Sequence, residues 1–152
     1  DTNVYQEMGI KYDIENVLAT LMEYFDNIGT GAVDFVTLQG ETYGAGIQKR
    51  DYSLTDHDFM AFNVIVKYEG EAPRRLNPRE MTDLLADYGI PCVPIVDEHF
   101  VMPDTVDELL AIATGVSKVD GGMREGLVFR SADGVKSFKA VSNEFLMKYH
   151  NG

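Results

Sequence analysis

The first clear pattern along the chain is a set of apolar residues spaced three and four positions apart. It comprises Ile14, Val17, Leu18, Leu21, Met22 and Phe25. This spacing puts them on one face of an α-helix and leaves polar residues on the other. Asp13 is suited to cap the start of this helix, and Gly29 is suited to end it. The pattern therefore predicts an amphipathic helix that starts after Asp13 and ends near Gly29.

Two later stretches have the composition of β-strands. Residues 33–40 (VDFVTLQG) and 59–66 (FMAFNVIV) are rich in β-branched and aromatic residues, and we expect each to form a strand. The segment between them is polar and rich in glycine. A shorter apolar run at 90–96 (IPCVPIV) is interrupted by prolines, which suit the edge of a sheet rather than its centre.

Two more helices are expected in the second half of the chain. Asn77-Pro78 provides a start with proline in the first turn, and Gly89 provides an end. The inner face of this helix would carry Met81, Leu84 and Leu85. The segment PDTVDELLAIATG at 103–115 predicts the other helix, which is capped by Asp104 or Thr105 and closed by Gly115.

The C-terminal part predicts a β-hairpin. The runs at 125–131 (EGLVFRS) and 135–142 (VKSFKAVS) flank the sequence ADG, in which Gly134 suits the left-handed position of a three-residue turn. Because strands and helices mix without strict alternation, the expected fold class is α+β. A chain of 152 residues with 45% hydrophobic residues has the size and composition of one globular domain, residues 1–152.

The hairpin places a carboxylate and an amine near each other. If the turn pairs Ser131 with Val135, Leu127 lies opposite Lys139, and Glu125 is diagonal to Lys139 on the same face. Diagonal neighbours are roughly 7–8 Å apart at Cβ, which leaves room for a phosphate or a metal ion. Spacing alone favours an ordinary cross-strand ion pair instead, since short motifs often match by chance.

The charge distribution narrows the choice of partners. The net charge is −12, whereas a simple nucleic-acid binder normally presents a basic face. From Lys118 onward there are 6 basic and 4 acidic residues, which leaves 7 basic and 21 acidic residues before it. An anionic ligand would therefore bind the C-terminal fifth of the chain. Cys92 is the single cysteine and no apolar run is long enough to span a membrane, so we expect a reducing, cytoplasmic location.

Several segments resemble the ATP-dependent RNA ligases of the covalent nucleotidyltransferase superfamily. GETYGAGIQ (40–48) looks like motif III of these enzymes, and FMAFNV (59–64) looks like the motif that follows it. EGLVFR (125–130) resembles motif IV, and SFKAVSNEFLMKY (137–149) resembles motif V. Each match alone is weak, but four in the right order are fairly specific. The resemblance implies an antiparallel-sheet nucleotidyltransferase (ATP-grasp-like ligase) domain.

The resemblance also implies roles for individual residues. Glu41 would contact the ribose of the adenylate, and Phe62 would stack on the adenine. Glu125 would hold a divalent metal, Mg²⁺ or Mn²⁺, or the attacking substrate end, and Lys139 would contact the α-phosphate of ATP. Without the family, Phe62 is equally suited to core packing and Glu41 to satisfying loop amides. In relatives a second motif V lysine commonly stands where this chain has Val141; Arg130 or Lys148 is a candidate substitute.

The implied reaction needs a nucleophilic lysine, which the family carries in K-x-(D/N)-G upstream of motif III. Lys11-Tyr12-Asp13 lacks the glycine, and it is too close to motif III. Lys118-Val119-Asp120-Gly121 has the right letters but stands directly before motif IV, and it reads as a turn leading into EGLVFR. We therefore interpret Lys118 as a chance match. The nucleophile is then expected outside this chain, in a missing N-terminal part of the domain.

Two functions of different classes follow from these observations. In the first, the chain is the C-terminal part of an RNA ligase for RNA repair, whose partners are ATP and RNA ends; alone it is expected to be incapable of self-adenylylation. In the second, it is a non-catalytic nucleotide- or protein-binding module derived from the ligase fold, for which the acidic charge favours a protein partner. A DNA ligase or a capping guanylyltransferase fits GETYGAGIQ less well. The histidines, His57, His99 and His150, are scattered and form no metal set.

Overall fold

A computed structural model describes residues 4–43, 58–119 and 121–149. The helices in these ranges are α1 (Val4–Lys11), α2 (Ile14–Ile28), α3 (Pro78–Ala86), α4 (Val106–Ala113) and α5 (Asn143–Tyr149). The strands are β1 (Val33–Tyr43), β2 (Asp58–Tyr68), β3 (Arg74–Arg75), β4 (Gly126–Arg130) and β5 (Ser137–Val141). The predicted α+β class is confirmed. The predictions omitted α1, β3 and α5.

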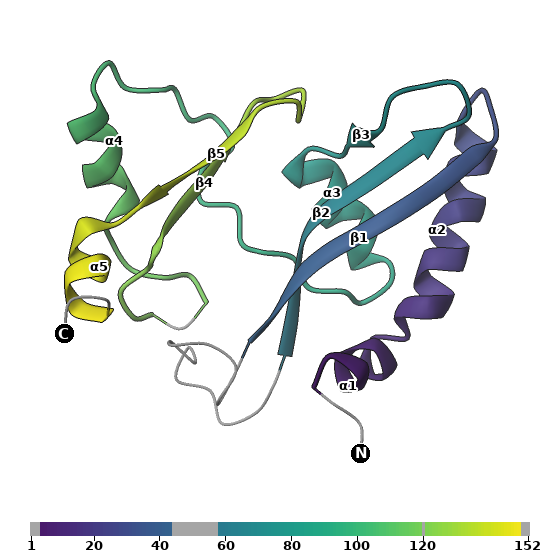
Figure 1. Ribbon diagram of the computed structural model, residues 1–152, viewed down its shortest axis with the longest axis horizontal. Helices are drawn as coiled ribbons and strands as arrows, with labels where there is room; N and C mark the ends of the chain where they lie inside the picture. Colours follow the sequence, from purple (N-terminus) through teal and green to yellow (C-terminus); the bar gives the residue numbers. More distant parts are fainter. Residues whose placement is uncertain (1–3, 44–57, 120, 150–152) are drawn as a thin grey trace.

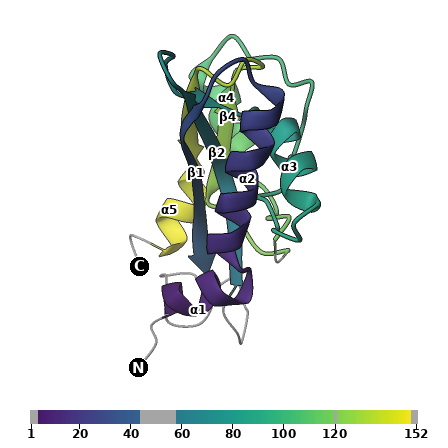
Figure 2. The same cartoon turned by 90° about the vertical axis from the view of Figure 1, so that its right-hand side faces the viewer.

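The larger sheet is antiparallel, with the strand order β1-β2-β3. Figures 1 and 2 show α2 and α3 lying along this sheet. Val64 and Val66 of β2 are fully buried, and they pack with Leu21 and Phe25 of α2 and with Leu85 of α3. We call the opposite side of the sheet its outer face. Because side chains alternate along a strand, burial of one face by the helices leaves the outer face for other contacts.

The two predicted caps in the second half of the chain are confirmed. Asn77 and Glu80 form a capping box, in which the Asn77 side chain accepts the Glu80 N–H at 2.9 Å. The Thr105 hydroxyl accepts the Glu108 N–H at 3.2 Å at the start of α4. Asp13 stands at the predicted cap position of α2, but its backbone is left-handed and its carboxylate accepts hydrogen bonds from the Asn16 side chain instead.

A β-bulge interrupts the pairing of β1 with β2. Gln39 pairs with Asn63, and the next residue, Gly40, pairs with Ala61, so Phe62 has no opposite residue on β1. Ala61 and Val64 both belong to the core that the helices cover. Phe62 and Asn63 therefore both lie on the outer face. Bulges redirect side chains in this way, often beside active sites.

The second sheet is the predicted hairpin of β4 and β5, with α4 beside it (Figure 1). Its register differs by one residue from the prediction. Lys139 pairs with Val128 rather than with Leu127, and Ser131 bonds to Lys136 rather than to Val135. The turn takes one more residue than expected because the Asp133 carboxylate accepts the backbone N–H of Val135 inside the turn.

The tip of this hairpin, residues 131–136, connects the two sheets. Gly134 has φ +76° and is buried against the backbone of β3. A Cβ added at Gly134 would stand 2.9 Å from the carbonyl oxygen of Arg75. Glycine is thus required here both for the left-handed conformation and for the close approach to β3.

The predicted edge strand at 90–96 is reduced to a single bridge. Ala61 of β2 donates its N–H to Pro91 O at 2.8 Å, and Ala61 O accepts the N–H of Val93 at 2.9 Å. The prolines lack the N–H groups that a longer ladder needs, which accounts for the difference.

We expect Gly134→Ala to lower the free energy of unfolding more than Gly70→Ala does. Both glycines have φ near +77°, but a Cβ at Gly70 meets no atom within 4 Å. The control should therefore lose about 1–2 kcal/mol from backbone strain alone, while the Gly134 variant loses more from the clash with β3. Urea unfolding measures both variants, and equal losses would contradict the proposed contact of the tip with β3.

Candidate active site

Glu125 and Lys139 form a direct ion pair at the base of the hairpin. Lys139 Nζ lies 2.8 Å from Glu125 Oε1, and the two side chains are 47% and 44% exposed. The observed register would put these residues on opposite faces if Glu125 belonged to the paired strand. Glu125 instead precedes β4, so the pleat does not fix the direction of its side chain. The sequence predicted room for a phosphate or a metal ion between the two side chains, but here their charged groups touch each other directly.

The backbone of Glu125 is held from two sides. Its carbonyl accepts the N–H of Ser142 at 2.6 Å, which closes the base of the hairpin. The preceding residue, Arg124, donates from its guanidinium to the carbonyls of Ile112, Ala113 and Thr114 at the end of α4. A cation at a helix C-terminus satisfies unpaired carbonyls and complements the helix dipole.

Close strand packing at the base of the hairpin also requires Gly126. A Cβ at this position would collide with the carbonyl oxygen of Ala140 on β5. The Glu-Gly pair of EGLVFR thus has a local physical basis: the glycine lets the strands approach, and the glutamate stands where the pairing begins.

Glu41 and Phe62 lie together on the outer face of the larger sheet. Glu41 pairs with Met60, and Phe62 is two residues beyond Met60 on β2, in the bulge. Beside Phe62, Asn63 donates from its side chain to Gln39 Oε1 at 2.7 Å, while its own Oδ1 is buried and has no hydrogen-bond partner among the described residues. A buried unsatisfied acceptor is costly in a folded protein, so it marks a place where a donor from a ligand would fit.

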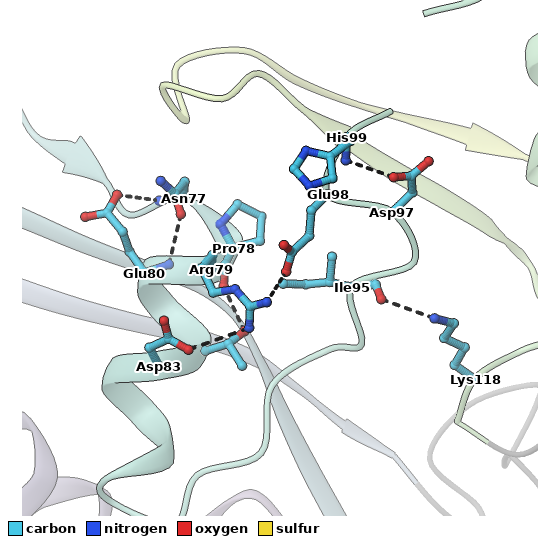
Figure 3. A network of polar contacts seen from close by, with 11 residues as sticks. Asn77, Pro78, Arg79, Glu80, Asp83, Ile95, Asp97, Glu98, His99 and Lys118 are labelled. Atoms are coloured by element: carbon cyan, nitrogen blue, oxygen red, sulfur yellow. Dashed lines mark hydrogen bonds and ion pairs between the residues drawn. The ribbon is translucent and has the colours of Figure 1, made fainter. Parts of the chain in front are cut away.

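Lys118 contacts the segment at residues 95–98, which a polar network also links to α3 (Figure 3). The ammonium of Lys118 donates to the carbonyl of Ile95 at 3.3 Å. Arg79 of α3 pairs with Glu98 at 2.5 Å. Ser117 donates its N–H to Gly122 O at 2.6 Å and accepts the N–H of Gly121 at 2.9 Å, which forms the expected turn before EGLVFR; Asp120 lies outside the described residues.

Lys11, the other lysine considered, belongs to a polar cluster that links the helical N-terminal segment to β2. The hydroxyl of Tyr12 donates to the carboxylate of Asp58, and Lys11 Nζ lies 3.5 Å from the same carboxylate. Burial tends to raise the pKa of Asp58, but the hydrogen bonds from Tyr12 and Phe59 and the charge of Lys11 outweigh it and lower the pKa. Burial and the contact with Asp58 raise the pKa of Tyr12.

Other features of the described residues do not coincide with these positions. A cavity of about 310 Å³ between α2 and α3 is lined by residues that include Tyr24, Arg74 and Asp87. Among the described residues, no group of three or more His, Cys, Asp and Glu side chains is arranged to hold a metal ion. No described helix is long and apolar enough to cross a membrane.

Comparisons with known proteins agree with this arrangement. A family model described as RNA ligase matches residues 5–150. The chain belongs to the RNA ligase family. Among solved structures, a Naegleria gruberi RNA ligase mutant with AMP and Mn is similar over 99% of this chain, with a TM-score of 0.79 and 30% identity. Another mutant of that ligase, with ATP and Mn, is similar over the whole chain, with a TM-score of 0.77 and 28% identity. A search of curated proteins found no match.

This chain corresponds to less than half of the length of these ligases. This chain spans 42% of the ligase chain with AMP and Mn, and 43% of the one with ATP and Mn. The antiparallel nucleotidyltransferase fold expected from motifs III to V is therefore confirmed for a portion of the relatives' length.

Sequence reasoning missed several residues around the site. Arg124 gave no signal beyond its position before Glu125, because its role depends on where α4 ends. The link between Tyr12 and Asp58 joins residues 46 positions apart, and no local pattern predicts it. The motif FMAFNV contains Asn63, but the sequence does not show that its Oδ1 is buried and, among the described residues, has no hydrogen-bond partner.

The Asp58 cluster should make stability depend on pH in the acid range. Because the folded-state pKa of Asp58 is lowered, its contribution is present above the unfolded pKa of about 4 and is lost as pH falls through the folded pKa. We expect Asp58→Asn to cost about 1 kcal/mol at pH 7, since the side chain is partly exposed, and little at pH 2–3. Urea unfolding across pH measures this, with Tyr12→Phe as a second variant. A loss that is the same at both pH values would contradict the assignment.

Proposed function

We propose that this chain is part of an ATP-dependent RNA ligase that joins RNA ends through lysyl-adenylate and RNA-adenylate intermediates. The observation that carries the proposal is the Glu125–Lys139 ion pair, located where motifs IV and V meet in a chain of the RNA ligase family. An exposed ion pair contributes little to stability, so substitutions at Lys139 can test the site without unfolding the chain. In the reaction, a lysine takes AMP from ATP and releases pyrophosphate, AMP passes to an RNA 5′-phosphate, and a neighbouring 3′-hydroxyl displaces it.

Lys139 and Glu125 would act on the phosphates. Lys139 would contact the α-phosphate and stabilise the negative charge that develops there during transfer. Glu125 would contribute a carboxylate to Mg²⁺ or Mn²⁺ or orient the attacking substrate end. One protein carboxylate is compatible with such an ion, because Mg²⁺ commonly keeps several waters and takes further oxygens from substrate phosphates. Before substrate binds, the ion pair keeps both charges compensated.

Glu41 and Phe62 would bind the nucleoside. Both lie on the outer face of the sheet, where a ribose and an adenine could be held by adjacent side chains. Phe62 is free of cross-strand pairing because it occupies the bulge, so its ring is available for stacking on a base. The unpaired Oδ1 of Asn63 beside it would accept a hydrogen bond from an exocyclic amine.

The nucleophilic lysine would be supplied by a part of the domain outside this chain. The matched ligases are more than twice as long as this chain, since it covers 42% of the ligase with AMP and Mn. Apolar side chains are exposed on both faces of the hairpin, with Val128 at 55% on one face and Phe138 at 44% on the other. On its own the chain would form no lysyl-adenylate.

A non-catalytic binding module remains the second candidate. The excess of acid over base is concentrated before Lys118, with 21 acidic and 7 basic residues, which favours a protein partner over RNA for such a module. A module that binds only a protein partner needs no contribution of Lys139 to nucleotide binding, so a dependence of nucleotide binding on Lys139 separates it from the ligase.

We expect Lys139→Ala to weaken binding of ATP with Mn²⁺ by about 10- to 100-fold, because a hydrogen bond from a charged group to phosphate is lost. Isothermal titration calorimetry of the chain measures the affinity. Lys136→Ala is the matched control, since Lys136 lies at the tip of the same hairpin and is exposed. Equal affinities for the two variants would argue against the ligase assignment and for the binding module.

Covalent labelling examines the missing nucleophile separately. The chain incubated with labelled ATP and Mg²⁺ should carry no stable label. Label that forms on the chain and disappears in Lys118→Ala would show that Lys118 is the nucleophile and that the chain is self-sufficient.

A further inference from the structure

Two adjacent arginines of β3 have different surroundings. Arg74 pairs with Val66 on the helix-covered side, and its guanidinium lies 3.4 Å from the Glu80 carboxylate of α3. Arg75 pairs with Ile65, so its side chain lies on the outer face. There its Nε is buried and, within the part of the chain that the structure describes, has no hydrogen-bond partner. Within one short strand, therefore, one arginine has a carboxylate partner and the other has a buried donor without an acceptor.

Arg130 lies at the end of β4, on the hairpin that reaches β3. It is half-buried, and burial followed by the positive charge of Arg75 lowers its pKa. Throughout the described residues, the side chains of Arg75 and Arg130 form no hydrogen bond or ion pair. The contact of Gly134 with the Arg75 carbonyl brings β3 to the hairpin that carries Arg130, so two partly buried arginines without a carboxylate partner in the described part of the chain lie in neighbouring elements.

Packing keeps the two arginines in this arrangement. Gly134 in the hairpin tip lies against the carbonyl of Arg75, and this contact holds the tip on β3. Arg130 pairs with Ser137 in the register that places Lys139 opposite Val128. Arg130 and Lys139 therefore share one face of the hairpin, and as diagonal neighbours their Cβ atoms are roughly 7–8 Å apart. The cations form a series from Lys139 through Arg130 to Arg75.

A partly buried charge without a partner is unfavourable, and two like charges add repulsion. An anionic phosphate group would reduce both costs, because guanidinium groups bind phosphate oxygens through paired hydrogen bonds. We propose that Arg75 and Arg130 together bind a phosphate group of the substrate, next along from the α-phosphate assigned to Lys139. The proposal rests on the proposed function, and it gives Arg130 a partner from a different sheet.

Two sources could supply this phosphate: the β- and γ-phosphates of ATP, or the backbone of the RNA strand. Both offer anionic phosphate oxygens that guanidinium groups bind. The test therefore uses four probes: inorganic pyrophosphate, ATP with Mn²⁺, a short RNA with a 5′-phosphate, and the same RNA with a 5′-hydroxyl. The variants are Arg75→Gln and Arg130→Gln. Arg74→Gln is the matched control from the same strand.

We expect each of Arg75→Gln and Arg130→Gln to weaken at least one probe by about 5- to 10-fold and to lower the salt dependence of RNA binding by about one unit per arginine. Arg74→Gln should change affinity by less than about 2-fold. Loss with pyrophosphate and ATP supports a nucleotide phosphate. Loss with both RNAs alone supports a strand phosphate, and loss that needs the 5′-phosphate supports the RNA end.

Thermal unfolding checks that the variants remain folded. Because the substitutions remove repulsion, we expect no fall in the melting temperature without ligand, whereas pyrophosphate should raise that of the unsubstituted chain more than that of the variants. If Arg75→Gln and Arg130→Gln bind all four probes with the same affinities as Arg74→Gln does, the proposed phosphate site is wrong. That result, combined with weaker ATP binding in Lys139→Ala, would leave the ligase function standing. Loss in the arginine variants with no effect of Lys139→Ala would support the phosphate site and reject the role of Lys139.

Discussion

The burial of one face of β2 against α2 and α3 is the constraint on which the remaining arrangement depends. Val64 and Val66 are fully buried there, together with Leu21 and Phe25 of α2. Since side chains alternate along a strand, packing on this side fixes which residues lie on the outer face. The bulge then adds Phe62 to that face, beside Asn63. A strand that serves the core thus also positions the candidate nucleoside-binding residues.

The second sheet, the β4–β5 hairpin, positions the charged groups of Glu125 and Lys139 at its base. Two-stranded sheets are marginally stable alone. Here the base of the hairpin is tied to α4 through Arg124, and its tip is seated on β3 through Gly134. These two attachments explain how an exposed pair such as Glu125 and Lys139 can have a defined geometry without being buried.

Much of the fold was predictable because its signals are local. The periodicity of α2, the capping box of α3 and the Thr105 cap of α4 each depend on residues within a few positions of one another. The weaker predictions concern contacts that no local pattern determines. The hairpin register was wrong by one residue because Asp133 lengthened the turn, and the edge strand at 90–96 was reduced to one bridge by its prolines.

The sequence by itself determined strands β1, β2, β4 and β5, helices α2, α3 and α4, and the motif order that resembles RNA ligases, from which the candidates Glu41, Phe62, Glu125 and Lys139 come. The strands and helices follow from residue type and spacing, which act over a few positions along the chain, whereas the site candidates follow only from the resemblance to RNA ligases. The tertiary structure alone decided that Phe62 occupies a bulge and that the hairpin tip at Gly134 lies against Arg75 of β3. Such features depend on register and on contacts between sheets, and their energies arise between residues far apart in sequence.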